Sequence, residues 1–250
     1  AWESKGDLDS AVANYEKAIE IDADYAEAYF GRGNSRQKNG DFEGAIADYG
    51  RAIMLDPKNA VAYCNRGNIW QGRGDLNGAI ADYDRAIRID PRYAVAYSNR
   101  GNARQAKGDF KGASEDYRRA IRLEPGFAPA YHNRSIARRA RGDFRGAIED
   151  CSKVIELDPR FSKAYVERGH ARQDAGDFGG AIEDYSRAIE INPRSVDAYG
   201  SRGSLRVAQG NFPAGIADFE KALEIAPANW SYRKLVEVHL AKARKKLAGQ

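Results

Sequence analysis

The feature that most constrains this chain is a repeat with a fixed period of 34 residues. A glycine followed by Asp or Asn and then by an apolar residue returns at this interval without a slip, at Gly6, Gly40, Gly74, Gly108, Gly142, Gly176 and Gly210. A row of prolines keeps the same interval, at Pro57, Pro91, Pro125, Pro159, Pro193 and Pro227. A fixed period of this length is typical of stacked supersecondary units, in which each unit contacts only its neighbours. The chain is therefore predicted to form an elongated array and not one globular core.

Composition places few further limits on the chain. The 40 basic and 36 acidic residues are interspersed and leave a net charge of +4, which is not the pattern of a nucleic-acid-binding arm. No apolar run approaches the roughly 18–20 residues of a membrane span. Cys64 and Cys151 fall in different repeats, so we expect no structural disulfide. The two cysteines do not identify a compartment, although the cytoplasm is slightly favoured, and a targeting segment upstream of Ala1 is compatible with a chain that opens inside a repeat.

The period divides the chain into repeats whose positions can be numbered from Ala26 as position 1. The predicted array covers residues 1–229, with a partial repeat at 1–25 followed by six full repeats at 26–59, 60–93, 94–127, 128–161, 162–195 and 196–229. Residues 1–25 supply positions 10–34 of an earlier repeat, so the chain is expected to start within a first helix that ends at Gly6. Residues 230–248 are predicted to form one more helix, from Trp230 to Leu247, that caps the last repeat with a polar, basic outer face.

Each repeat is predicted to contain two helices, which makes the fold class all-α. The first helix occupies about positions 1–14 and ends at the glycine of position 15, which suits a left-handed C′ residue. The Asp or Asn that follows is a good N-cap for the second helix. The second helix runs to about position 30 and stops before the proline, because a residue that precedes proline avoids the α region. The small residues at position 8 are expected to let helix backbones approach, with the position-4 tyrosines filling the space beside them.

The position pattern resembles the tetratricopeptide repeat (TPR). The shared features are an aromatic residue at position 4, small residues at positions 8, 20 and 27, an aromatic residue at position 24 and a proline at position 32, over residues 1 to about 229. The resemblance implies an α-solenoid, a right-handed superhelix of antiparallel helix pairs. It also implies that the first helices line a concave groove, which usually holds an extended peptide or a helix of a partner protein.

Charged residues occupy positions that the helices are expected to bury. Arginine stands at position 7 of every full repeat and at position 11 of all but one, where Trp70 replaces it, while position 23 of the second helix is always aspartate. A charge at a packing position needs a partner. We therefore predict a ladder of Arg–Asp pairs between the two helix layers, which favours one register more than it adds net stability.

The candidate binding residues are side-chain amides at positions that face the groove in TPR proteins. They are Asn65, Asn99 and Asn133 at position 6, Asn34, Asn68 and Asn102 at position 9, and Gln37, Gln71 and Gln105 at position 12. Because a carboxamide both donates and accepts hydrogen bonds, such rows suit the backbone of an extended peptide whatever its sequence. The arrangement is similar to the asparagine ladder in the TPR domain of O-GlcNAc transferases, although nothing resembles their catalytic domain. The alternative is that these amides form an ordinary solvated polar face.

A second TPR device, the clamp that chaperone-binding members use for a C-terminal carboxylate, is matched only in part. Asn102, Asn133 and Lys163 fit its pattern, and Lys163 is included among the candidate peptide-binding residues. Ser98 and Glu167 do not fit, and the carboxylate of Glu167 would repel the ligand. We therefore do not expect this clamp.

Catalysis has little support in the sequence. The three histidines, His132, His170 and His239, show no zinc-type spacing with the cysteines, so we expect no cofactor and no metal. Glu167, His170 and Asp174 share one helix face and could chelate a metal together with His132, but nothing fixes them as ligands. The glycines of Gly-Asn-Ala-Arg and similar strings lie within helices and do not follow strands, so they are not phosphate loops.

The sequence thus predicts a non-enzymatic protein–protein interaction scaffold that binds an extended peptide or partner segment in its groove. The first alternative is a structural protein or adaptor that self-associates, as a homo-oligomer, through its open repeat ends. A weaker alternative is a nucleic-acid-binding platform, which we do not expect because the groove lacks a continuous basic stripe with stacking aromatics.

Overall fold

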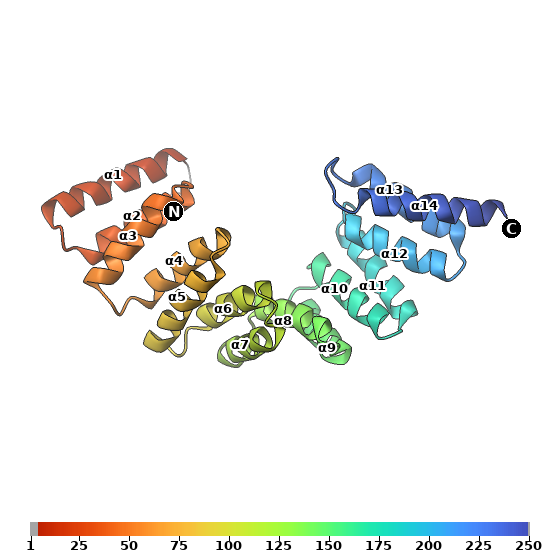
Figure 1. The fold of residues 1–250 in the computed structure, drawn as a ribbon, viewed down its shortest axis with the longest axis horizontal. Coiled ribbons are helices and arrows are strands. Elements are labelled where there is room, and N and C mark those ends of the chain that lie inside the picture. Colours follow the sequence, from red (N-terminus) through yellow and green to blue (C-terminus); the bar gives the residue numbers. More distant parts are fainter. Residues whose placement is uncertain (1–4, 250) are drawn as a thin grey trace. The chain divides into compact units, whose positions relative to one another are not determined.

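The computed structural model describes the backbone of residues 5–249 and the side chains of residues 7–249. Over this part of the chain it contains fourteen α-helices and no strand, as the all-α prediction requires (Figure 1). The chain divides into two compact units, residues 1–127 and residues 128–250, and the boundary falls between two repeats. Each unit is described by itself below.

Unit 1 contains the first seven helices, which pack in chain order. Their bounds are α1 Lys5–Ile21, α2 Ala26–Lys38, α3 Phe42–Leu55, α4 Ala60–Gly72, α5 Leu76–Ile89, α6 Ala94–Ala106 and α7 Phe110–Leu123. The pairs α2–α3, α4–α5 and α6–α7 belong to single repeats, and the short turns that join them make the paired helices antiparallel. The expected end of a helix at Gly6 is wrong, because α1 begins at Lys5 and runs through Gly6. Residues 1–4 lie outside the described part.

Unit 2 repeats this plan and ends with one additional helix. Its bounds are α8 Ala128–Ala140, α9 Phe144–Leu157, α10 Ser162–Asp174, α11 Phe178–Ile191, α12 Val196–Ala208, α13 Phe212–Ile225 and α14 Arg233–Ala248. The last helix begins three residues later than predicted, so that Trp230 belongs to the turn before α14 and not to the helix. Val236 and Leu240 of α14 pack against Phe219 of α13, which covers the end of the last repeat.

The turns within the repeats confirm the predicted capping chemistry. The glycines at position 15 have φ between 79° and 87°, which is the left-handed conformation that glycine adopts without strain. The Asp75 carboxylate then caps α5 by accepting a hydrogen bond from the amide of Gly78 at 2.9 Å. A Cβ atom on Gly78 would lie 2.5 Å from the second carboxylate oxygen, which explains why glycine recurs at this position despite its poor helix propensity.

The aromatic residue that fills the space beside the position-8 glycines is the one at position 24, not the one at position 4 as predicted. A Cβ atom on Gly101 would lie 2.7 Å from the ring of Tyr117, which is fully buried. The position-4 ring of Tyr97 instead lies between two guanidinium groups, 5.5 Å from Arg100 and 5.8 Å from Arg119. It therefore serves as a cation–π surface at the edge of the repeat.

In one repeat, positions 8 and 24 fit together with different residues. At position 8 of residues 128–161 the glycine is replaced by Ser135, and the tyrosine at position 24 is replaced by Cys151. Both side chains are buried. Because the larger residue in the first helix leaves no room for a ring, the smaller Cys151 is required in the second.

The predicted Arg–Asp pairs are present in all six full repeats. In the repeat of residues 94–127, the Arg100 guanidinium donates to both oxygens of Asp116, at 3.0 and 2.5 Å, and Arg104 donates at 2.9 Å. Asp116 itself is only 3% exposed. The corresponding pairs are Arg32 and Arg36 with Asp48, Arg66 with Asp82, Arg134 and Arg138 with Asp150, Arg168 and Arg172 with Asp184, and Arg202 and Arg206 with Asp218.

The position-7 arginine also reaches the preceding repeat. Arg100 donates to Asp84 at 2.6 Å, and Arg202 donates to the Ser186 hydroxyl at 2.9 Å. Burial by itself lowers the pKa of Arg100, but the hydrogen bonds and charges of Asp116 and Asp84 outweigh it, so the pKa is raised and the guanidinium stays charged. One side chain thus joins the two helices of its own repeat to the second helix of the repeat before it.

We expect Asp116→Ala to destabilise the protein by about 2–4 kcal/mol, because it leaves the partly buried Arg100 and Arg104 without their shared carboxylate. Urea unfolding followed by circular dichroism measures the change. The matched control is Glu115→Ala, which removes an exposed carboxylate one residue away on the same helix. Equal unfolding midpoints for the two variants would contradict a structural role for the pairs.

The fit between positions 8 and 24 predicts a rescue. Gly101→Ser should destabilise by about 1–3 kcal/mol through overpacking against Tyr117, and Tyr117→Cys by about 3–5 kcal/mol through a cavity. The double variant copies the Ser135 and Cys151 pair. Its loss of unfolding free energy should be smaller than the sum of the two single losses by about 0.5 kcal/mol or more. Thermal unfolding of the four proteins in parallel tests this, and strict additivity would show that the two positions are independent.

Candidate peptide-binding surface

The predicted amides of unit 1 form a hydrogen-bonded row along neighbouring first helices. Asn65 of α4 donates from Nδ2 to Oδ1 of Asn34 on α2, at 3.0 Å, and Asn99 of α6 donates to Asn68 of α4 at 2.9 Å. We call the asparagines at positions 6 and 9 of α2, α4 and α6 the amide ladder. Its five members are Asn34, Asn65, Asn68, Asn99 and Asn102, and all are partly exposed.

The core holds the position-9 amides in one orientation. The Tyr49 hydroxyl donates to Oδ1 of Asn34 at 2.8 Å, and Tyr83 and Tyr117 do the same for Asn68 and Asn102. Burial raises the pKa of Tyr49 to about 12, so its hydroxyl keeps the proton that this bond needs at neutral pH. In Asn34 and Asn68 the oxygen accepts two hydrogen bonds from the protein, and the described contacts leave the Nδ2 group for an acceptor from outside.

The glutamines at position 12 meet the same hydroxyls. Oε1 of Gln37 lies 2.6 Å from the Tyr49 hydroxyl, and the corresponding distances for Gln71 and Gln105 are 3.0 and 3.3 Å. A tyrosine hydroxyl carries one proton, so it donates to the asparagine or to the glutamine at any moment. The glutamines thus lie beside the ladder and contact the same tyrosine hydroxyls. Their Nε2 groups make no described hydrogen bond.

The remaining predicted residues lie in unit 2, where the ladder pattern stops. Oδ1 of Asn133 lies 3.3 Å from Nδ1 of His132, and Lys163 is exposed on α10. Position 9 in this unit is occupied by Ile136, His170 and Ser204, so no row of position-9 amides is possible.

Glu167 is held as a carboxylate by cationic neighbours. It lies 3.8 Å from Arg139 and 3.9 Å from His170. Burial would raise its pKa, but the nearby His170, Arg139 and His132 outweigh this, and the pKa of Glu167 is lowered. An ionised Glu167 is unfavourable for a bound C-terminal carboxylate, which agrees with the mismatch to the carboxylate clamp.

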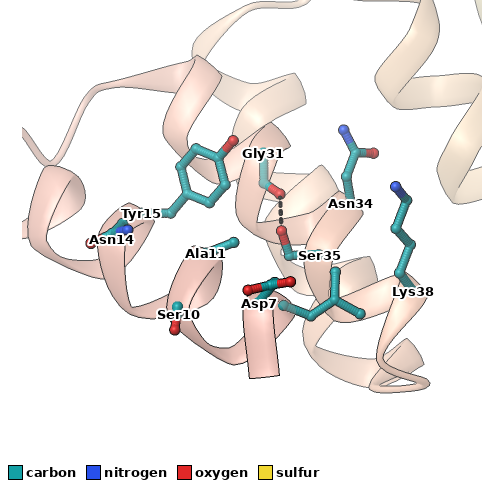
Figure 2. A pocket seen from close by; sticks show the side chains of 10 residues that line it. Asp7, Ser10, Ala11, Asn14, Tyr15, Gly31, Asn34, Ser35 and Lys38 are labelled. Atoms are coloured by element: carbon teal, nitrogen blue, oxygen red, sulfur yellow. Dashed lines mark hydrogen bonds between the residues drawn. The ribbon is translucent and has the colours of Figure 1, made fainter. Parts of the chain in front are cut away.

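Two hollows open on the first helices. One, of about 520 Å³, lies between α1 and α2, and Tyr15, Gly31 and Asn34 border it (Figure 2). The other, of about 450 Å³, lies in unit 2 against positions 5, 6 and 9 of α12 and is closed on one side by Trp230 and Tyr232. The sequence analysis missed both aromatic residues as site candidates, since it placed them in the first turn of the last helix.

Metal-binding groups, reactive thiols and membrane-spanning helices were looked for in the described part of the chain. No group of three His, Cys, Asp or Glu side chains in residues 7–249 is placed to hold a metal ion. Cys64 and Cys151 are free and buried, and burial raises the pKa of Cys151 to about 12, which keeps this thiol protonated and unreactive. None of the helices in the described part combines the length and the apolar character needed to cross a membrane.

Family models for tetratricopeptide repeats match nearly the whole chain. A TPR repeat model matches residues 4–40, 38–71 and 73–108, and further tetratricopeptide repeat models match residues 94–127, 128–161 and 166–229. The chain belongs to the tetratricopeptide repeat family. No curated protein matches it.

Solved structures of TPR proteins share the fold. The crystal structure of MamA is 28% identical and covers 68% of this chain and 92% of its own, with a TM-score of 0.62. A TPR protein from Parabacteroides merdae is 20% identical over 96% of this chain and 93% of its own, with a TM-score of 0.68. YrrB, described as a TPR protein with an unusual peptide-binding site, is 22% identical over 78% of this chain and 97% of its own, with a TM-score of 0.62.

The family determines the kind of protein more than the details of the site. TPR arrays are typically non-enzymatic scaffolds. In this array the ladder residues are on the first helices α2, α4 and α6, and their described hydrogen bonds run from one repeat to the next.

Proposed function

We propose that this TPR protein is a non-enzymatic scaffold that binds an extended peptide segment of a partner protein along its first helices. The observation that carries the proposal is the fixed orientation of the amide ladder. In the position-9 asparagines Asn34 and Asn68 the oxygen is occupied and Nδ2 remains as a donor, while the position-6 asparagines Asn65 and Asn99 donate from Nδ2 and retain Oδ1 as an acceptor.

An extended peptide offers the complementary groups. Its backbone repeats one N–H donor and one C=O acceptor at every residue, so a row of alternating donors and acceptors can bind it independently of side-chain sequence. Each such bond contributes about 0.5–1.5 kcal/mol net. The peptide-binding site in the description of YrrB, a TPR protein of the same fold, supports this class of ligand. Gln37, Gln71, Gln105, Asn102, Asn133 and Lys163 complete the proposed binding residues.

The ladder predicts that binding depends on the peptide backbone. The variant that combines Asn65→Ala, Asn99→Ala and Asn133→Ala should bind peptides on an array about ten- to a hundredfold more weakly, from the loss of two or three hydrogen bonds. N-methylation of alternate amides of the best peptide should weaken binding to the parent to a similar extent.

The matched control is the pair Asn39→Ala and Asn77→Ala. These carboxamides are exposed and make their described hydrogen bonds to Asp9 and Lys107, away from the ladder. Peptide affinity should be unchanged in the control, and thermal unfolding should show that all variants are folded. Equal binding by the triple variant and the parent would remove the ladder from the proposed function.

A second candidate function, end-to-end association of copies, is favoured by the hollow between α1 and α2. Tyr15 occupies position 24, but its ring is only partly buried, whereas Tyr49, Tyr83 and Tyr117 at the same position are fully buried by their own first helices. In this candidate function a helix of a second copy would pack into the hollow that Figure 2 shows beside the Tyr15 ring. Sedimentation velocity separates the two functions, because association predicts a mass that rises with protein concentration and falls in Tyr15→Asp.

A further inference from the structure

The hollow in unit 2 differs chemically from the amide ladder. It has a volume of about 450 Å³, and we call it the aromatic–acidic pocket, defined by Asp197, Ser201, Ser204, Trp230, Tyr232 and Leu235. The small residues Gly200, Ser201 and Ser204 at positions 5, 6 and 9 of α12 provide its depth. A volume of this size accepts a long side chain together with part of the backbone that carries it.

One wall of the pocket is aromatic and open to solvent. The rings of Trp230 and Tyr232 meet edge to face, with centroids 6.1 Å apart and planes at 63°. Tyr232 is 60% exposed and Leu235 is 50% exposed, although both are large apolar side chains. A patch of exposed apolar side chains that is bordered by polar groups is typical of a binding surface.

The charges of the opposite wall leave one carboxylate unmatched. The cation of this wall, Arg139, is occupied by Asp174 at 3.1 Å and by Glu167 at 3.8 Å. His170 is hydrogen bonded to the Ser201 hydroxyl at 3.1 Å, and the ring of His239 packs 6.1 Å from that of Phe219. Asp197 is exposed in the first turn of α12 and makes no ion pair among the described contacts. The lining thus contains two carboxylates, Asp174 and Asp197, and one guanidinium, Arg139, which is already paired with Asp174.

We propose that the aromatic–acidic pocket receives an arginine or lysine side chain of a peptide. The cation would lie against the faces of Trp230 and Tyr232 and beside the carboxylate of Asp197, while its aliphatic stem covers Leu235. An acidic side chain finds no free cation in this pocket, and a purely apolar side chain would remove Asp197 from water without a partner. The proposal rests on the proposed function only in that the ligand is a peptide.

The test uses end-capped peptides Gly-Ser-X-Ser-Gly in which X is Arg, Lys, Leu or Glu, titrated into the full chain. The indole N–H resonance of Trp230, assigned with Trp230→Leu, reports on the pocket. The Arg and Lys peptides should shift this resonance in a saturable manner, and the Glu peptide should not. Asp197→Asn and Trp230→Leu should each weaken the Arg peptide by about fivefold or more, the latter measured from the remaining pocket resonances.

The matched control is Glu183→Gln, which removes the same charge from an exposed position of α11 outside the pocket and should leave the affinity unchanged. The ladder variant Asn65→Ala, Asn99→Ala should also retain binding of the Arg peptide, so failure of the pocket and failure of the ladder give different results. Equal affinity for the Glu and Arg peptides, no effect of Asp197→Asn, or no saturable shift with any of the four peptides would overturn the proposal.

Discussion

The bidentate pair between the position-7 arginine and the position-23 aspartate is the interaction on which the stacking of this array depends. Apolar contacts between helices tolerate sliding, but a guanidinium fork matches a carboxylate in one geometry only. In Arg100 the same fork also reaches Asp84 of the preceding repeat, so that one side chain sets both the pairing within a repeat and the stacking between two. Gly50 occupies the place of Asp84 one repeat earlier and offers Arg66 no acceptor, so that junction lacks the arginine link and is bridged instead by Asn65 with Asn34 and by Arg73 with Glu43.

The packing of positions 8 and 24 determines which repeats can hold the amide ladder. The position-24 ring is packed against the position-8 glycine, and its hydroxyl emerges beside positions 9 and 12, where it fixes the asparagine oxygen. In the three full repeats of unit 1 a tyrosine at position 24 accompanies an asparagine at position 9. Cys151 and Phe219 have no hydroxyl to donate, and their repeats carry Ile136 and Ser204 at position 9. The row of position-9 asparagines therefore ends at the repeat in which Cys151 replaces the tyrosine, although Tyr185 restores the hydroxyl in the next repeat beside His170 and donates to Gln173 instead.

The sequence was sufficient for the helices, their caps and the Arg–Asp pairs, because each follows from short-range chemistry repeated at a known period. It was insufficient wherever the answer depended on which side chain meets which across the repeat. The tyrosine facing the position-8 glycine was assigned to position 4, since periodicity places both rings on apolar faces and only the packing of the pair selects Tyr117. Trp230 was likewise assigned to the last helix, although it lies in the turn before α14. There it borders a pocket that periodicity cannot predict.

Under these two proposals, the units would offer two kinds of recognition chemistry. In unit 1 the proposed binding groups are neutral amides hydrogen bonded to buried tyrosines, and neutral amides would select for the backbone that all peptides share. In unit 2 the amides at position 9 are absent, and the smaller side chains of α12 leave a hollow in which aromatic rings and an unpaired carboxylate select for charge. A scaffold with only the first surface would bind extended segments without discrimination. A charge-selective pocket would supply this discrimination, because a ligand that removes Asp197 from water without pairing its carboxylate binds less well. The small residues of one face of α12 are what make room for the pocket.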